Sequence, residues 1–307
     1  MYIGIDETGN FISDKLNFFI SIFIRYKYLN EIEILFKKWE KSLPKECRDL
    51  KGEVKGHLLS EEILYDFIEK IIYNNFYQIN YCCYGVETNQ NSWNHVNLQR
   101  RITIEQITSA IEEYRKKGKK YYKVANQYSN MLCWYKNQSE QNILKITVLG
   151  TTILNSLNHA ICFSAVNSFD NELGFLQYKI DKDFIHKGAK EIYWKEILRN
   201  QLWSRHGITR VKEWDKNHPF LKTFVKEEKG NRFVIKNEFK NRINFYNSHL
   251  SFEIRIADIV STINRKYITE RKCKIAFNKL RQLNFSKGIY THLLFTMNKN
   301  QIPSPFK

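Results

Sequence analysis

Two short apolar segments open the chain, and a polar turn separates them. Residues 1–6 combine apolar and β-branched side chains, and a Thr-Gly-Asn stretch then interrupts the segment as a turn does. Residues 18–26 form a second apolar segment with partial alternation. Because so short a connection typically joins neighbouring strands of opposite direction, we expect a β-hairpin here. The chain therefore begins with two antiparallel strands, and Asp6 and Glu7 stand at the end of the first.

Hydrophobic periodicity predicts helices and strands along the rest of the chain. Helices are expected at residues 29–42, 60–71, 188–201, 252–263 and 272–283, and strands at 77–86, 173–180, 232–236 and 289–297. Residues 98–160 show mostly helical patterns and are expected to form an insertion. Strands interspersed with helices are typical of α/β proteins. We expect one domain over residues 1–307, with a mixed sheet of about five strands flanked by helices.

The chain is strongly basic, with 49 Lys and Arg against 32 Asp and Glu, so its formal net charge is 49 − 32 = +17. Such a charge raises association rates with polyanions without fixing a fold, and nucleic acid is the partner we expect. A Lys-rich surface that merely reflects an AT-rich genome would give the same count. The basic segment 115–120, flanked by tyrosines, offers phosphate contacts, although we favour a solvated helix end there.

Cysteine and histidine spacings indicate neither a zinc site nor a disulfide framework. The six cysteines include no C-x-x-C pair, and the eight histidines show no H-E-x-x-H or H-x-H pattern. The sequence shows no run of eighteen apolar residues and no basic leader before an apolar stretch. We therefore expect a cytoplasmic protein with reduced thiols and no membrane partner; a protein partner or a homo-oligomer is compatible with the sequence.

Four acidic residues occupy positions where carboxylates can converge on one edge of a sheet. Asp6 ends the first strand, Glu53 precedes a helix, Asp181 ends a later strand, and Asp258 lies in a C-terminal helix. Magnesium prefers carboxylate oxygens and keeps several waters, so a few such residues can hold it beside a phosphate. A carboxylate at the end of an almost wholly apolar strand would otherwise be a costly charge, which favours Asp6. Rivals to Asp181 are Glu87, Glu172 and Asp183.

Short motifs around these residues resemble those of the domain-of-unknown-function 3800 family. The Asp-Glu-Thr-Gly motif at residues 6–9 is similar to the Asp-Glu-Ser-Gly start of that family, and the Glu-Val-Lys-Gly motif at residues 53–56 to its Glu-x-Lys element. Ser248 followed by Ile-Ala-Asp at residues 256–258 resembles its Ser…Gln-x-Ala-Asp ending. Asp181 falls where the family has an internal aspartate.

The resemblance covers residues 2 to about 267 and implies a ribonuclease H-like fold with a metal-dependent nuclease site. It implies Mg²⁺ or Mn²⁺ as the cofactor. The residues that it assigns to the site are Asp6, Glu53, Asp181 and Asp258 as metal ligands, supported by Glu7 as a further ligand and by Lys55 at the scissile phosphate or attacking water. Two departures are Thr8 in place of Ser and the lack of the Gln before the Ala-Asp pair. Helical periodicity alone would expose Asp258, away from the apolar stripe of its helix, although the residue could still face a cleft at the sheet edge.

The expected function is hydrolysis of phosphodiester bonds in DNA or RNA by a magnesium-dependent nuclease. His57 near Glu53 and His186 near Asp181 are candidate proton shuttles, with a hydrogen-bonding role as the alternative. The rival function is a non-catalytic nucleic-acid-binding or interaction protein in which the carboxylates are vestigial. A third hypothesis is a subunit of a defence or mobile-element system.

Overall fold

A five-stranded mixed sheet forms the centre of the protein. The computed structural model describes residues 1–9, 16–88, 90–168, 170–182, 217–228, 232–235 and 237–285. The sheet has the order β3-β2-β1-β4-β7 and consists of β1 (Tyr2–Thr8), β2 (Leu16–Ile24), β3 (Ile79–Glu87), β4 (Gln177–Asp181) and β7 (Ile243–Tyr246). β1, β2 and β3 pair antiparallel in sequence order, whereas β4 pairs parallel with both β1 and β7. A separate hairpin joins β5 (Val225–Glu228) to β6 (Arg232–Ile235).

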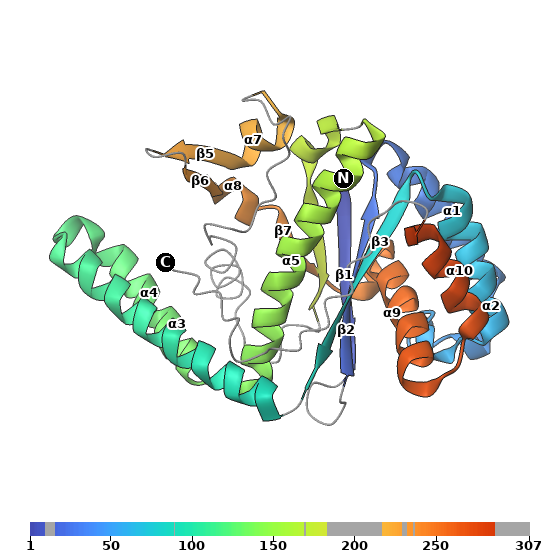
Figure 1. Ribbon diagram of the computed structural model, residues 1–307, viewed down its shortest axis with the longest axis horizontal. Coiled ribbons are helices and arrows are strands. Elements are labelled where there is room, and N and C mark those ends of the chain that lie inside the picture. The colour runs from blue at the N-terminus through green and yellow to red at the C-terminus, as the bar shows by residue number, and fades with distance from the viewer. Residues whose placement is uncertain are drawn as a thin grey trace.

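Helices flank this sheet on both faces (Figure 1). They are α1 (Leu29–Ser42), α2 (Glu61–Phe67), α3 (Gln90–Lys116), α4 (Tyr122–Lys136), α5 (Glu140–Asn167), α7 (Pro219–Phe224), α8 (Asn237–Lys240), α9 (Phe252–Glu270) and α10 (Lys274–Phe285). Short 3-10 helices lie at Tyr26–Tyr28, Lys45–Cys47, Gly56–Leu58, Tyr73–Asn75, Lys119–Tyr121, Asp170–Phe175 and Ser248–Leu250, and a π-turn at Ile68–Ile72 follows α2. The expected α/β class with a five-stranded mixed sheet is confirmed, and it is compatible with a ribonuclease H-like fold. No helix in the described ranges is long and apolar enough to cross a membrane.

The alternation of side chains along β1 divides the core into two layers, because successive residues of a strand point to opposite faces. Ile3 and Ile5 belong to the layer that packs against α5. Ile20 and Ile22 of β2 belong to the layer that packs against α9, α1 and α2. The even-numbered residues of β1, which include Gly4 and Asp6, therefore face α9.

The helical region after β3 was expected to be an insertion, but its last helix is part of the core. It begins at Gln90 and ends at Asn167, and its last helix, α5, contributes Ile153, Leu157 and Ile161 to the layer beneath the sheet. This helix is apolar over most of its length, so it covers the sheet rather than extending beyond it. The α3–α4 hairpin projects from the body (Figure 1).

Most expected elements in the described ranges are found, with shifted ends. α1 has the expected bounds, whereas α9 continues to Glu270, and the strand that ends on Asp181 begins only at Gln177. β7 was not identified from its sequence, because four residues in a mixed polar context give too short a pattern. The expected helix at 188–201 and strand at 289–297 lie outside the described residues.

Candidate active site

Asp6 and Asp181 lie side by side at one edge of the sheet. β1 and β4 are parallel, and Ile5 pairs with Ile180, so the two aspartates that follow occupy neighbouring positions. Lys179, two residues before Asp181, forms an ion pair with Glu253 of α9, which shows that this side of β4 also faces α9. The register therefore directs both carboxylates toward α9.

α9 brings the third carboxylate, Asp258, to the same edge. The helix can approach β1 because Gly4 has no side chain: a Cβ built there would lie 2.6 Å from the backbone carbon and oxygen of Glu253. Asp258 follows Glu253 on α9, and its Oδ2 accepts a hydrogen bond of 3.0 Å from the backbone N–H of Gly56. The exposure of Asp258 expected from periodicity alone is wrong: the side chain has intermediate exposure because residues 48–56 lie over this part of α9.

A compact turn presents Glu53 and Lys55 beside Asp258. Asp49 Oδ1 accepts hydrogen bonds from the backbone N–H groups of Lys51, at 2.8 Å, and Glu53, at 3.0 Å. Gly52 adopts a positive φ of 79°, which a residue with a side chain rarely adopts. An isolated antiparallel bridge between Arg48 and Val54 closes the turn. The local sequence thus favours this turn, and the hydrogen bond from Gly56 to Asp258 fixes the position of the turn against α9.

Lys55 places a positive charge among these carboxylates. Its Nζ lies 3.1 Å from Oε1 of Glu53. Burial alone would lower the pKa of Lys55, but the hydrogen bond to Glu53 and the charges of Glu53, Asp258 and Asp6 raise it above its ordinary value. The ammonium group is therefore protonated and partly offsets the negative charge of the cluster.

Burial and like charges act together on Asp6. Its side chain is buried, and burial, followed by the charges of Asp258, Asp181 and Glu7, raises its pKa well above the ordinary value. Burial also raises the pKa of Asp258, although the N–H of Gly56 and the charges of Lys55 and His57 oppose this. Carboxylates in such surroundings favour any process that supplies positive charge, either a proton or a cation.

Glu7 lies apart from this group, although the resemblance implies that it binds the metal with Asp6. It follows Asp6 on β1 and therefore points to the opposite face of the sheet, where Lys145 of α5 lies 2.7 Å from its Oε1. Both side chains of this pair are largely buried. The negative charge of Glu7, on the side of the sheet that faces α5, still contributes to the raised pKa of Asp6.

The structure places two of the other candidates, Glu172 and Glu87, apart from Asp6 and Asp181. Glu172 lies at the opposite end of the sheet, where it pairs with Arg25 at 2.9 Å and accepts from the backbone of Tyr26. Glu87 ends β3, which is two strands away from β1. His57 is exposed next to Gly56, and its charge acts on Asp258. Asp183 and His186 lie outside the described residues.

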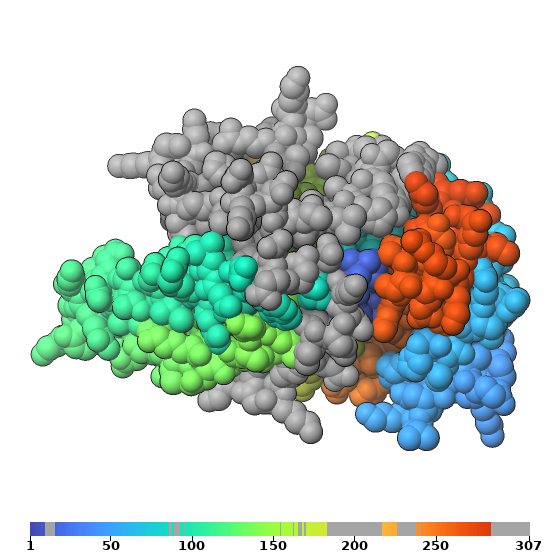
Figure 2. Space-filling view, turned by 60° about the horizontal axis from the view of Figure 1, so that its bottom comes forward, coloured from blue at the N-terminus to red at the C-terminus, as the bar shows by residue number. Residues whose placement is uncertain are grey.

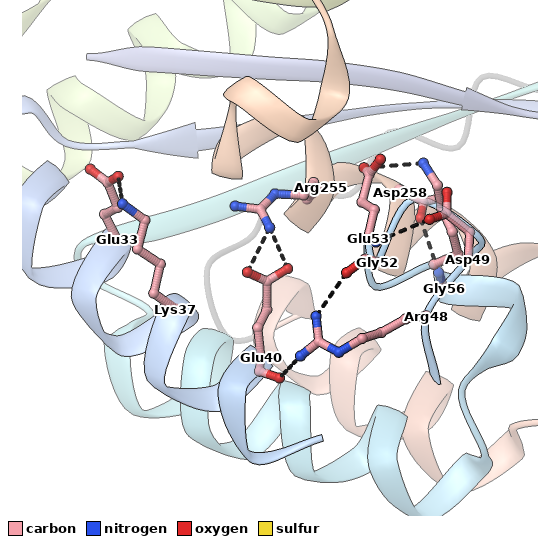
Figure 3. A network of polar contacts seen from close by, with 11 residues as sticks. Glu33, Lys37, Glu40, Arg48, Asp49, Gly52, Glu53, Gly56, Arg255 and Asp258 are labelled. Atoms are coloured by element: carbon pink, nitrogen blue, oxygen red, sulfur yellow. Dashed lines mark hydrogen bonds and ion pairs between the residues drawn. The ribbon is translucent and has the colours of Figure 1, made fainter. Parts of the chain in front are cut away.

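A buried ion pair between Glu40 and Arg255, which sequence patterns did not identify, links α1 to α9 next to the site (Figure 3). Both oxygens of Glu40 in α1 accept from Nη1 of Arg255 in α9, at 2.5 and 2.6 Å. Arg48 donates to the backbone oxygens of Glu40 and Gly52, at 2.5 and 3.0 Å. The pair joins residues 215 positions apart, so no local motif could have indicated it. Through these contacts α1 ties the turn 48–56 to the helix that carries Asp258.

The donor set fits a hard divalent cation, since it consists of carboxylate oxygens. As the side chains stand, no group of three or more His, Cys, Asp or Glu residues in the described ranges is arranged to hold a metal ion. Magnesium does not require such a group, because it retains waters and binds through one or two carboxylates together with substrate phosphates. The residues that could supply those carboxylates are Asp6, Glu53, Asp181 and Asp258.

Comparisons of this chain with protein-family models, with curated proteins and with solved structures find no match. The resemblance in the motifs at residues 6–9, 53–56 and 256–258 stays a prediction.

Proposed function

We propose that this chain is a magnesium- or manganese-dependent nuclease that hydrolyses phosphodiester bonds of DNA or RNA. The observation that carries the proposal is the convergence of Asp6, Asp181 and Asp258 on one sheet edge, where burial and like charges raise the pKa of Asp6. Placing like charges in a buried site costs stability unless a cation offsets them. Such a cost is typical of functional sites, where charge is arranged for a ligand rather than for folding.

In this proposal Asp6, Glu53, Asp181 and Asp258 hold the metal. When bound, the metal would activate the attacking water and stabilise the leaving oxygen of the phosphodiester. Lys55 interacts with the charges of both Asp6 and Asp258, and it would orient the scissile phosphate through its ammonium group. The net charge of +17 favours a polyanionic substrate over a neutral one.

A non-catalytic nucleic-acid-binding protein is the second candidate, and one contact favours it. Lys55 already supplies a protonated ammonium group 3.1 Å from Glu53, so the protein's own cation partly replaces a metal. Under this alternative the carboxylates are vestigial, and the basic surface alone binds the partner.

Cleavage assays distinguish the two candidates. Labelled single- and double-stranded DNA and RNA are incubated with Mg²⁺ or Mn²⁺ and with wild type, Asp6→Asn or Glu46→Gln, which alters an exposed carboxylate that is not a candidate ligand. We expect metal-dependent cleavage by wild type and Glu46→Gln, and a loss of at least about 100-fold in Asp6→Asn, since a metal ligand supplies several kcal/mol of transition-state stabilisation. Absence of cleavage by wild type on every substrate, with nucleic-acid binding unchanged in Asp6→Asn, would favour the binding protein.

Thermal unfolding provides a readout that does not depend on activity. A ligand that binds only the folded state at 100 times its Kd stabilises that state by about 2.7 kcal/mol. Saturating Mg²⁺ should therefore raise the unfolding temperature of wild type and of Glu46→Gln but not that of Asp6→Asn. An equal rise in all three proteins would place the metal away from this cluster.

A further inference from the structure

The α3–α4 hairpin forms a rod that extends from the body, with its root at the edge of the sheet that carries the carboxylates. β3 ends at this edge, and α3 begins at Gln90, soon after it. With 27 residues, α3 is roughly 40 Å long at 1.5 Å per residue. Figure 2 shows the rod on the side of the molecule opposite α1 and α2. The rod thus leads away from the candidate site over a distance much longer than a single nucleotide.

The rod is held together along its length by an apolar seam. Ile107 and Ile111 of α3 and Met131 and Tyr135 of α4 are buried members of the layer on the α5 side. Near the tip, tyrosine rings replace the aliphatic seam: Tyr114 packs against the rings of Tyr121 and Tyr128, with centroids 6.1 and 5.6 Å away. Because these rings stabilise the tip, exposed charges there can be altered without removing the packing.

The end of the rod concentrates positive charge. Residues 90–136 contain nine Lys and Arg against three Glu, which gives 9 − 3 = +6. Six of these cations are exposed around the turn at Gly118, and we call them the basic tip: Arg115, Lys116, Lys117, Lys119, Lys120 and Lys123. Lys117 lies 2.5 Å from Glu113, an ion pair typical of an exposed helix. Clustered cations of this kind repel one another, so a polyanion that binds them relieves the repulsion.

The surface of the rod favours nucleic acid over a membrane. A helix that lies on a bilayer needs an exposed apolar face, whereas Tyr122 is the one large hydrophobic residue of the rod with an exposed side chain among those described. Phosphates, by contrast, require only accessible Lys and Arg side chains.

We propose that the basic tip binds the phosphate backbone of a nucleic acid at a distance from the candidate active site, since the tip lies roughly 40 Å along the rod from the edge of the sheet that carries that site. This inference rests on the proposed function for its substrate class, and it adds that the substrate is a long polynucleotide. It also revises the interpretation of segment 115–120 as merely a solvated helix end.

The test compares two triple variants in the full chain. Lys116→Gln/Lys119→Gln/Lys120→Gln neutralises half of the basic tip and leaves the Lys117–Glu113 pair intact. Lys38→Gln/Lys41→Gln/Lys45→Gln is the matched control, because it removes the same charge from exposed positions on and just after α1. Binding of fluorescein-labelled 30-base-pair DNA and RNA duplexes is followed by anisotropy in EDTA, at 50 to 200 mM KCl.

Each phosphate contact contributes about 0.9 to the slope of log affinity against log salt, so three contacts contribute roughly 2.7. Between 50 and 200 mM KCl, wild type and control should therefore lose about 40-fold more affinity than the tip variant does. Equal salt slopes in all three proteins would overturn the proposal. It would also be overturned if the tip substitutions weakened binding to phosphatidylserine vesicles but not to duplexes.

Because EDTA removes the divalent metal, the binding test does not depend on whether the protein cleaves its substrate. If wild type cleaves while the tip variant binds duplexes as wild type does, the tip proposal fails and the nuclease stands. If no substrate is cleaved but the salt slopes differ as expected, the nuclease fails and the tip proposal stands.

Discussion

Gly4 lies where α9 comes closest to the sheet, and Gly4→Ala would test how the candidate site is held together. The new Cβ would lie 2.6 Å from the backbone carbon and oxygen of Glu253 and 2.7 Å from its Cβ. Carbon atoms attract one another best at roughly 3.5 to 4.0 Å, so strand and helix would have to separate by about 1 Å. Rotation of a side chain cannot relieve this overlap, because the atoms in closest contact belong to the backbone.

We expect Gly4→Ala to lower the free energy of unfolding by about 2 kcal/mol. Overpacking of a dense core costs up to roughly 3 kcal/mol. Replacement of glycine in a strand lowers the conformational entropy of the unfolded chain, which offsets about 1 kcal/mol of that cost. With an m value of about 3 kcal/mol/M, the urea midpoint should fall by roughly 0.7 M. Since α9 carries Asp258, the stabilisation by Mg²⁺ should also decrease.

Urea unfolding followed by tryptophan fluorescence measures this loss, with Gly85→Ala as the matched control. Gly85 lies in β3, where the nearest atom to a new Cβ is a ring carbon of Phe18 at 3.5 Å, an ordinary contact. The control should therefore unfold within about 1 kcal/mol of wild type. Equal midpoints for Gly4→Ala and Gly85→Ala would refute the argument that α9 needs a glycine on β1.

Three further predictions concern buried charges. Burial lowers the pKa of His159 to about 4, so the unfolded chain binds an extra proton between pH 6.5 and 4, and this residue alone should lower stability by about 2 kcal/mol from pH 7.5 to 5. In urea unfolding at both pH values, His159→Phe should remove that share of the pH dependence. Glu40→Ala leaves Arg255 without its buried partner and should cost about 3 kcal/mol by the same assay, whereas replacing both residues with Met should recover most of the loss. Glu7→Gln should weaken the pair with Lys145 and lower the unfolding temperature, yet keep the full shift with Mg²⁺; a lost shift would return Glu7 to the metal site.

Local patterns were sufficient to predict much of the fold and one member of the site. The two apolar segments at the start of the chain form β1 and β2, and the periodic residues 29–42 form α1. Asp6 was identified because a carboxylate at the end of an apolar strand is costly without a partner. These inferences succeed because alternation and helical periodicity depend on neighbours within a few residues.

The sequence by itself determined the elements and the acidic residues at their ends, whereas only the tertiary structure decided which carboxylates meet. Periodicity placed Asp258 on an exposed face, yet the turn 48–56 covers it, through a contact between residues 202 positions apart. Glu7 is adjacent to Asp6 in the sequence but faces α5 with Lys145. Which residues face one another depends on how closely α9 packs on β1. That distance is set by the absence of a side chain at Gly4 and by long-range partners, which no local pattern encodes.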